Sequence, residues 1–140
     1  MDYNNETRCL LNLNRLVFDT IHFSRRGFKN DNDLNLQLEA HISQKSEQDI
    51  YRVSLILKGE KCDEYNFEIG LTGFFSFTSN EIDEEQKQTL ISKNTLAILM
   101  PYLRSQVSLL TAQPETDCVV LPPLNINNIV DNSNSHKKTF

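Results

Sequence analysis

Apolar and polar residues alternate along four segments in the first half of the chain. Residues 10–23 alternate but change phase twice, which is typical of a strand that carries a bulge or a bend. Residues 34–42 alternate without a break, and residues 51–57 and about 64–78 continue with the same period of two. Short polar links separate these segments, and Lys58–Lys61 is expected to form a hairpin turn. The pattern predicts four strands that form an antiparallel meander with one apolar face.

A helical period replaces the alternation after the fourth strand. Asp83 is placed to cap the N-terminus of a helix, and Gln86 stands at the spacing of a capping box. Apolar residues then recur at helical spacing as far as Leu110. Pro101 lies inside this segment and is expected to kink the helix, because proline removes one backbone hydrogen bond and clashes with the preceding turn.

The remaining residues are expected to form an extended linker, a short helix and a tail. Residues 118–124, CVVLPPL, are apolar, but their two prolines remove donors that a strand inside a sheet needs. They are expected to lie extended on the body of the protein, followed by a short helix over Ile126–Val130. Residues 131–140 are polar and are expected to be disordered. The pattern therefore predicts a single α+β domain over residues 1–130, with a four-stranded antiparallel sheet packed on a long kinked helix.

Charge and hydropathy narrow the choice of partners. The formal net charge is -5 and the sequence pI is about 5.1, with no stripe of Lys and Arg to offset the acidic field. Such a field repels a phosphate backbone, so nucleic acid is not an expected partner. No apolar run approaches the roughly 18 residues of a membrane helix. The polar start, Met1–Glu6, lacks the basic and apolar regions of a signal peptide, so we expect a cytoplasmic protein.

Residues that carry catalysis or bind metals are scattered along the sequence. Cys9, Cys62 and Cys118 lie far apart and form no CxxC pair, so free thiols are expected rather than a disulfide or a zinc site. The three histidines are also dispersed, and the sequence contains neither a glycine-rich phosphate loop nor a nucleophile elbow. We therefore expect a binding protein with no catalytic residue, no cofactor and no metal.

Three segments of the second half stand out when they are taken in order along the chain. They are Gly73-Phe74-Phe75-Ser76-Phe77, the run NTLAILMPYLR from Asn94 to Arg104, and the run VLPPLNI from Val120 to Ile126. Together with Asn14-Arg15-Leu16 and Asp49–Val53 upstream, they resemble motifs of the SecB family of protein-export chaperones. The resemblance covers about residues 11–130, and the Pro-Tyr-x-Arg piece is its most specific part.

The resemblance implies an ATP-independent holdase that binds unfolded or precursor polypeptides in apolar grooves during protein export. It also implies a homotetramer, a dimer of dimers that pair through their long helices. Because the apolar stripe of the helix is wider than one sheet face covers, its excess is expected to meet another subunit. The expected interface residues are Leu96, Leu99, Leu103 and Val107. The client groove is expected to be lined by Phe74, Phe75, Phe77, Val120, Leu121, Leu124 and Ile126.

The family docks its translocation motor SecA partly through acidic residues on the outer face of the sheet. Thr20 and Ser24 occupy the matching positions here and are uncharged, so we expect weak or absent binding of SecA. The remaining candidates for partner docking on this face are Asp19, Glu64 and Glu68. The alternative function is a SecB-like chaperone that serves another client, such as the antitoxin of a toxin–antitoxin system, without handover to SecA.

Two further classes of protein stay open at this stage. A thioesterase built on a helix-against-sheet dimer would need a carboxylate at a cleft, and Asp19 and Glu68 are the candidates for it. An oligomeric scaffold without a ligand is the second class. Suppression of the aggregation of unrelated unfolded proteins without ATP would distinguish a holdase from both.

Overall fold

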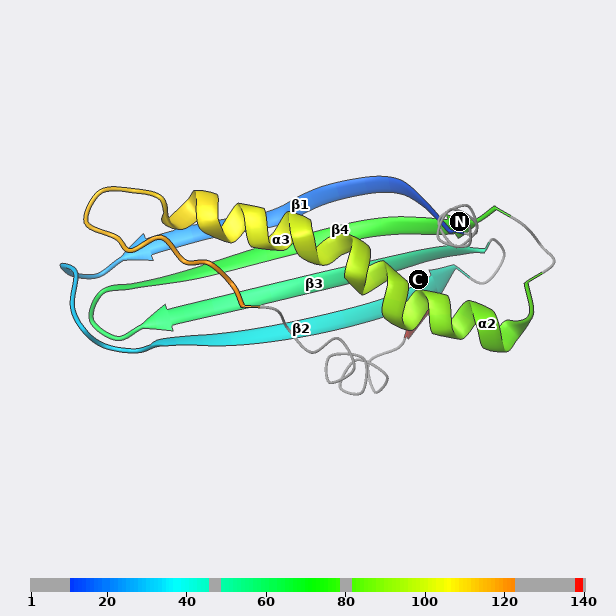
Figure 1. The fold of residues 1–140 in the computed structure, drawn as a ribbon, viewed down its shortest axis with the longest axis horizontal. Coiled ribbons are helices and arrows are strands. Elements are labelled where there is room, and N and C mark those ends of the chain that lie inside the picture. Colours follow the sequence, from blue (N-terminus) through cyan, green and yellow to red (C-terminus); the bar gives the residue numbers. More distant parts are fainter. Residues whose placement is uncertain (1–10, 46–48, 79–81, 123–137, 140) are drawn as a thin grey trace, which may run out of the picture.

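A computed structural model describes residues 11–45, 49–78, 82–122 and 138–139 of the 140-residue chain. Its main feature is a sheet of four long antiparallel strands (Figure 1): β1 (Leu11–Arg25), β2 (Leu34–Lys45), β3 (Ile50–Lys61) and β4 (Tyr65–Phe77). A helical layer covers one face of this sheet (Figure 1). The predicted α+β fold, a four-stranded antiparallel sheet against one long helix, is confirmed.

The strand order differs from a simple meander. The order across the sheet is β1-β4-β3-β2, so β1 pairs with β4 and not with β2. The loop between β1 and β2 therefore crosses the hairpin that joins β3 to β4. The amides of Arg26 and Gly27 donate to the Glu64 carbonyl at 2.7 and 3.1 Å, and the Asn32 side chain donates to the Cys62 carbonyl at 2.8 Å. These hydrogen bonds hold the β1–β2 loop against the turn between β3 and β4. The loop thereby carries the chain past the β3–β4 pair, from β1 on one side to β2 on the other.

The two phase changes predicted for the first strand are present as irregularities in its pairing. The register of β1 against β4 shifts between Leu13 and Arg15 and again between Phe18 and Thr20. Each extra residue turns the alternation over by one position, and this keeps Leu13, Phe18 and Phe23 packed against the core on the helix side of the sheet. Val17, opposite Thr72, is an exception and is 47% exposed.

The hairpin turn lies later than the sequence suggested. Lys58–Lys61 is part of β3, and the chain turns at residues 62–64, where Asp63 has a φ of 62°. The glycine that suggested a turn has another use. A Cβ atom on Gly59 would lie 2.3 Å from the ring of Phe67, so the missing side chain makes room for that ring.

The helical layer consists of α2 (Glu84–Thr89), a π-helical turn η1 (Leu90–Asn94) and α3 (Thr95–Thr111). Asp83 caps α2 as predicted, since its carboxylate accepts a hydrogen bond from the Gln86 amide at 2.7 Å. Pro101 lies inside α3, and the helix continues beyond it to Thr111.

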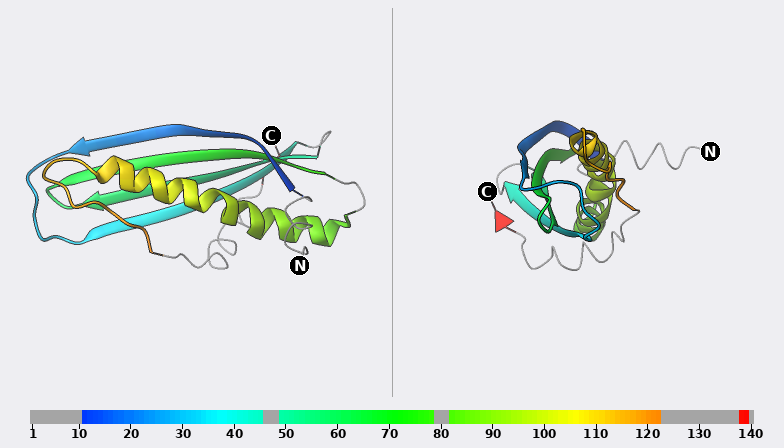
Figure 2. Two further views of the ribbon diagram at one scale, coloured as in Figure 1. Left: turned by 45° about the horizontal axis from the view of Figure 1, so that its top comes forward. Right: turned by 90° about the vertical axis from the view of Figure 1, so that its left-hand side faces the viewer.

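The hydrophobic core lies between the helical layer and the sheet. Seen end-on, the sheet curls around one side of the helices (Figure 2). Leu99 packs onto the sheet at Gly73, where an added Cβ atom would lie 2.9 Å from the Leu99 side chain. The fully buried residues of this core include Tyr51, Leu55, Ile69, Leu71, Phe75, Leu96, Leu103 and Val107.

After α3 the chain turns back along the helix (Figure 1). Residues 112–122, here called the linker, contain no helix or strand. The expected helix over Ile126–Val130 lies outside the described residues. Within residues 131–140, Lys138–Thr139 forms a short strand β5 parallel to β2, with Ser43 opposite Lys138.

Candidate functional site

The four residues predicted to form an oligomer interface face the sheet instead. Leu96, Leu99, Leu103 and Val107 each have 0% of their surface exposed in the single chain. They belong to the core cluster that also contains Leu71 of β4. The predicted interface is therefore corrected, because side chains that already fill the core cannot also contact a second subunit. Any contact of α3 with a partner must use its opposite side.

The opposite side of α3 carries exposed apolar residues. Leu109 is 70% exposed and Tyr102 is 45% exposed, and Pro101 is exposed beside them. Arg104 is the only charged residue within α3. This outward face is therefore mostly uncharged, although it does not contribute to the core.

A groove runs between the outward face of α3 and the linker. We call it the α3–linker groove, and it has a volume of about 670 Å³. From α3 it is lined by Pro101, Arg104, Ser105, Ser108 and Leu109, and beyond the helix by Ala112, Cys118, Val120 and Leu121. Val120 is 73% exposed, whereas Leu121 is buried and joins the core. Neighbouring linker residues thus have opposite roles, one anchoring the linker and the other facing solvent.

Hydrogen bonds and an ion pair hold the linker in place. Ser108 donates its hydroxyl to the Val119 carbonyl at 2.9 Å, and the Val119 amide donates to the Thr111 hydroxyl at 2.8 Å. Nearer the start of the linker, Lys29 pairs with Asp117 at 2.8 Å. Their hydrogen bond raises the pKa of Lys29 and lowers the pKa of Asp117. The linker wall of the groove is therefore formed before any ligand arrives.

The aromatic residues predicted for a client groove do not line the α3–linker groove. Phe75 is fully buried in the core. Phe77 lies near the start of the helical layer, where its ring centroid is 5.6 Å from that of Tyr51 and 5.7 Å from the Lys87 ammonium of α2. Phe74 is half-buried on the outer face of the sheet.

Of the linker residues predicted for the same groove, Val120 and Leu121 line the α3–linker groove. Leu124 and Ile126 lie outside the described residues. Among the described residues, this groove therefore lies between α3 and the linker, whereas the client groove predicted from the sequence lies between the sheet and the linker. Sequence reasoning missed Leu109 and Arg104 as lining residues, because the helical stripe on which it relied marks the buried face.

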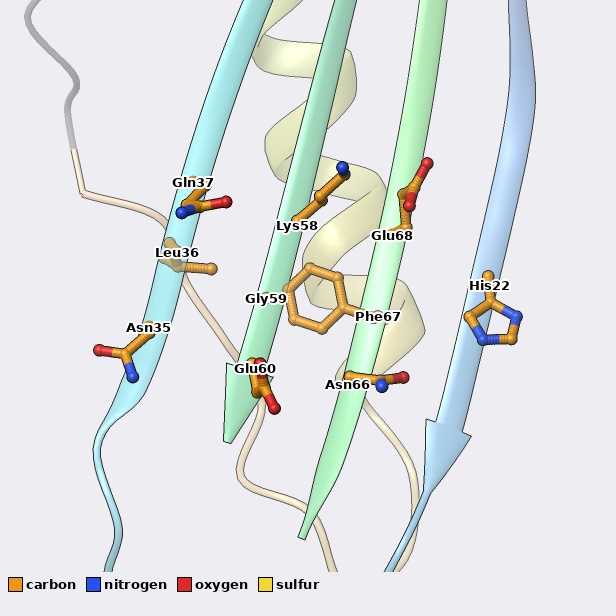
Figure 3. A pocket seen from close by; sticks show the side chains of 10 residues that line it. All are labelled: His22, Asn35, Leu36, Gln37, Lys58, Gly59, Glu60, Asn66, Phe67 and Glu68. Carbon is orange, nitrogen blue, oxygen red and sulfur yellow. The ribbon is translucent and has the colours of Figure 1, made fainter. Parts of the chain in front are cut away.

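The outer face of the sheet holds a second, polar hollow of about 740 Å³, which spans all four long strands (Figure 3). Glu68 lies in it between His22 and Lys58, its neighbours in register on β1 and β3. Asp19 also lies on this face and accepts a hydrogen bond from the Thr72 hydroxyl at 2.6 Å. The described charges of this face are balanced between cations and carboxylates: Arg15, Lys45, Arg52 and Lys58 against Asp19, Glu39, Glu60 and Glu68.

Glu64, the third residue suggested for partner docking, is not on the surface. Its side chain is fully buried, with Lys61 at 2.9 Å and the Asn30 amide donating to it at 2.8 Å. Burial alone would raise the pKa of Glu64, but these hydrogen bonds and the charges of Lys61 and Arg25 outweigh it and lower the pKa. Glu64 therefore serves to hold the β1–β2 loop on the hairpin and does not present its carboxylate to a partner.

Residues with metal-binding or catalytic chemistry lie apart from one another in the described part of the chain. Among residues 11–45, 49–78, 82–122 and 138–139, no three His, Cys, Asp or Glu side chains gather to hold a metal. Within the same ranges, no helix is both long and apolar enough to cross a membrane. Asp19 and Glu68, the candidates for a thioesterase, lie on the outer face and do not line the α3–linker groove.

Sequence comparison relates the chain to a known protein family. Residues 16–137 match the sequence profile of the family described as preprotein translocase subunit SecB. The uncharacterized protein MJ0357 of Methanocaldococcus jannaschii is 29% identical over 104 residues, which are 71% of this chain. The chain spans 66% of the length of that relative.

Among solved structures, the chain is similar to the SecB-like chaperone Rv1957 of Mycobacterium tuberculosis. That protein was solved in complex with a ChAD peptide from the Rv1956 HigA1 antitoxin. The alignment has a TM-score of 0.68 at 13% sequence identity, and it covers 84% of this chain and 93% of the other. At this identity the likeness concerns the fold.

Proposed function

The chain belongs to the SecB family, and from this premise we propose that it is an ATP-independent holdase that binds unfolded polypeptides in the α3–linker groove. We further propose that its clients include precursor polypeptides on their way to export and that it acts in the cytoplasm as a homotetramer. In this proposal the protein is a binding protein and not an enzyme.

The observation that carries the proposal is the pair of exposed apolar side chains on the two walls of the groove. Leu109 and Val120 are 70% and 73% exposed, although each belongs to a well-held element. Removing apolar surface from water contributes about 25 cal/mol per Å². An unfolded client offers apolar side chains in no fixed order, and a groove that binds by apolar contact tolerates that variety.

Binding of this kind needs no fuel. A protein that binds the unfolded state lowers the concentration of free unfolded chains by mass action, which slows their aggregation. The hydrogen bonds of Val119 and the ion pair of Lys29 with Asp117 hold the linker in advance, so less conformational entropy is lost when a client docks.

A second candidate is a chaperone for one dedicated client, such as an antitoxin, without handover to SecA. The balanced charges of the outer face favour it, because docking of SecA depends on acidic residues there. The structural neighbour from Mycobacterium tuberculosis binds a peptide of an antitoxin, which is the kind of client that this candidate requires.

The test is an aggregation assay with several unrelated unfolded proteins in the absence of ATP. The wild-type chain should suppress light scattering near stoichiometry. The double variant Leu109→Ser/Val120→Ser should lose most of this suppression while keeping its circular dichroism spectrum. Full suppression by the double variant would refute the groove as the client site.

Phe28 provides the matched control for this assay. It is 86% exposed in the loop between β1 and β2 and does not line the groove. Phe28→Ser removes a comparable exposed apolar side chain, so it should leave the suppression unchanged. If Phe28→Ser weakens suppression as much as the double variant, exposed apolar surface in general accounts for the activity.

A further inference from the structure

The α3–linker groove contains one charge among its apolar and small polar residues. Of the nine described residues that line it, Arg104 alone is charged, and it is also the only charged residue of α3. The whole chain carries a net charge of -5, so the charge of the groove is opposite in sign to the charge of the protein. This contrast suggests a role for Arg104 in the choice of ligand.

Arg104 lies on the side of α3 that holds the linker. It precedes Ser108 by four residues and Thr111 by seven, so the three side chains follow one ridge of the helix. Ser108 and Thr111 bind the backbone of Val119. The next linker residue, Val120, lines the groove together with Arg104. The guanidinium group therefore borders the same space as the exposed apolar side chains.

The guanidinium group is also available for binding. Arg104 is exposed, and no ion pair or hydrogen bond of its side chain is present among the described residues. The linker has two acidic side chains, Glu115 and Asp117, and Asp117 is paired with Lys29 at 2.8 Å. An arginine presents a planar fork of donors that matches a carboxylate, and such charge-assisted hydrogen bonds are among the stronger ones.

We propose that Arg104 makes the α3–linker groove selective for extended polypeptide segments that carry a carboxylate beside their apolar side chains. This inference rests on the proposed function and states which clients the groove prefers. Because the protein as a whole is acidic, its long-range field does not attract such segments. The preference must arise from short-range contact with Arg104, where an apolar ligand has displaced water and strengthened the interaction.

The test compares two fluorescein-labelled peptides by anisotropy with the full-length protein. The neutral probe alternates leucine and serine, and the acidic probe has aspartate in place of the serines beside its central leucine. The wild-type protein should bind the acidic probe about 3- to 10-fold more tightly than the neutral probe. This preference should shrink as salt is added, because the contact lies at the surface.

Three variants separate local contact from net charge. Arg104→Gln should abolish the preference, so that the variant binds the two probes with equal affinity, whereas Arg104→Lys should keep part of the preference. Lys93→Gln is the matched control, since it removes one positive charge from an exposed residue of η1 that does not line the groove. It should retain the full preference.

The proposal is overturned if the wild-type protein binds both probes equally, if Arg104→Gln keeps the preference, or if Lys93→Gln loses as much of it. Binding of neither probe would instead contradict the proposed function itself. If a second copy of the chain occupied the α3–linker groove, a different result would be expected. Probe affinity would then fall as the protein concentration rises, and Arg104→Gln would change the mass in light scattering. That result would also overturn the proposal.

Discussion

The two sides of α3 are built from similar residues and serve different purposes. On the inward side, Leu99 and Leu103 are completely buried against the sheet. On the outward side, Leu109 is 70% exposed and faces the groove beside the linker. The same residue type thus stabilises the fold on one side and offers a binding surface on the other.

This difference shows that an apolar residue on a helix has no function that its type alone determines. The inward leucines are needed because the sheet presents a gap at Gly73 that Leu99 fills. Once that face is covered, further apolar residues gain nothing from the core. Leu109 and Val120, which are exposed on the two walls of one groove, are therefore available to a ligand. The comparison can be tested by changing one side at a time.

The largest effect is expected from a charge on the inward side. Leu99→Glu places a carboxylate between α3 and Gly73, where it has no partner, and should cost more than about 4 kcal/mol. Circular dichroism and urea denaturation should show a loss of the fold. A stable variant that only changes its mass in light scattering would show that Leu99 is an interface residue after all.

The next effect compares two neighbours in the linker. Leu121→Ser removes a buried side chain and should cost about 2–4 kcal/mol of unfolding free energy. Val120→Ser changes a side chain that is 73% exposed and should stay within about 0.5 kcal/mol. Thermal melts of both variants test this. Equal losses of stability would mean that the linker does not separate an anchoring residue from a groove residue.

A smaller effect is expected on the outward side of α3. Leu109→Ser should weaken the binding of an apolar client peptide by about 1–2 kcal/mol, because a client that covers this side chain removes its surface from water. The melting temperature should hardly change. Fluorescence anisotropy and a thermal melt on the same sample give both values. A variant that loses stability but keeps its affinity would assign Leu109 to the core.

The smallest effect concerns the outer face of the sheet, which is remote from both sides of α3. Its balanced charges and the uncharged Thr20 and Ser24 predict no strong, salt-sensitive binding of SecA. Titration calorimetry at low and high salt measures this directly. Tight binding that disappears in Glu68→Gln would show that the outer face docks SecA with a single carboxylate.

The periodic pattern of the sequence was enough to predict the strands, the two irregularities of β1 and the cap at Asp83. Each of these is a local feature, determined by the alternation of a few residues or by one side chain near one backbone amide. The motif around Pro101 and Arg104 also placed the chain near its family. These predictions hold because neighbours in sequence suffice to decide them.

Other features depended on contacts between distant segments, and local patterns did not predict them. The sequence suggested a turn at Gly59, but the Phe67 ring occupies the space there. It suggested a docking role for Glu64, but Lys61 and Asn30 enclose that carboxylate.

The largest difference concerns which apolar residues of α3 and the linker remain exposed. The hydrophobic pattern by itself predicted an apolar stripe on the helix that includes α3 and an extended apolar segment over residues 118–124. Only the tertiary structure decided that Leu103 and Leu121 are buried while Leu109 and Val120 are not. The reason is physical. Burial depends on what packs against a side chain, and the position of the sheet and the linker around α3 is a property of the whole fold.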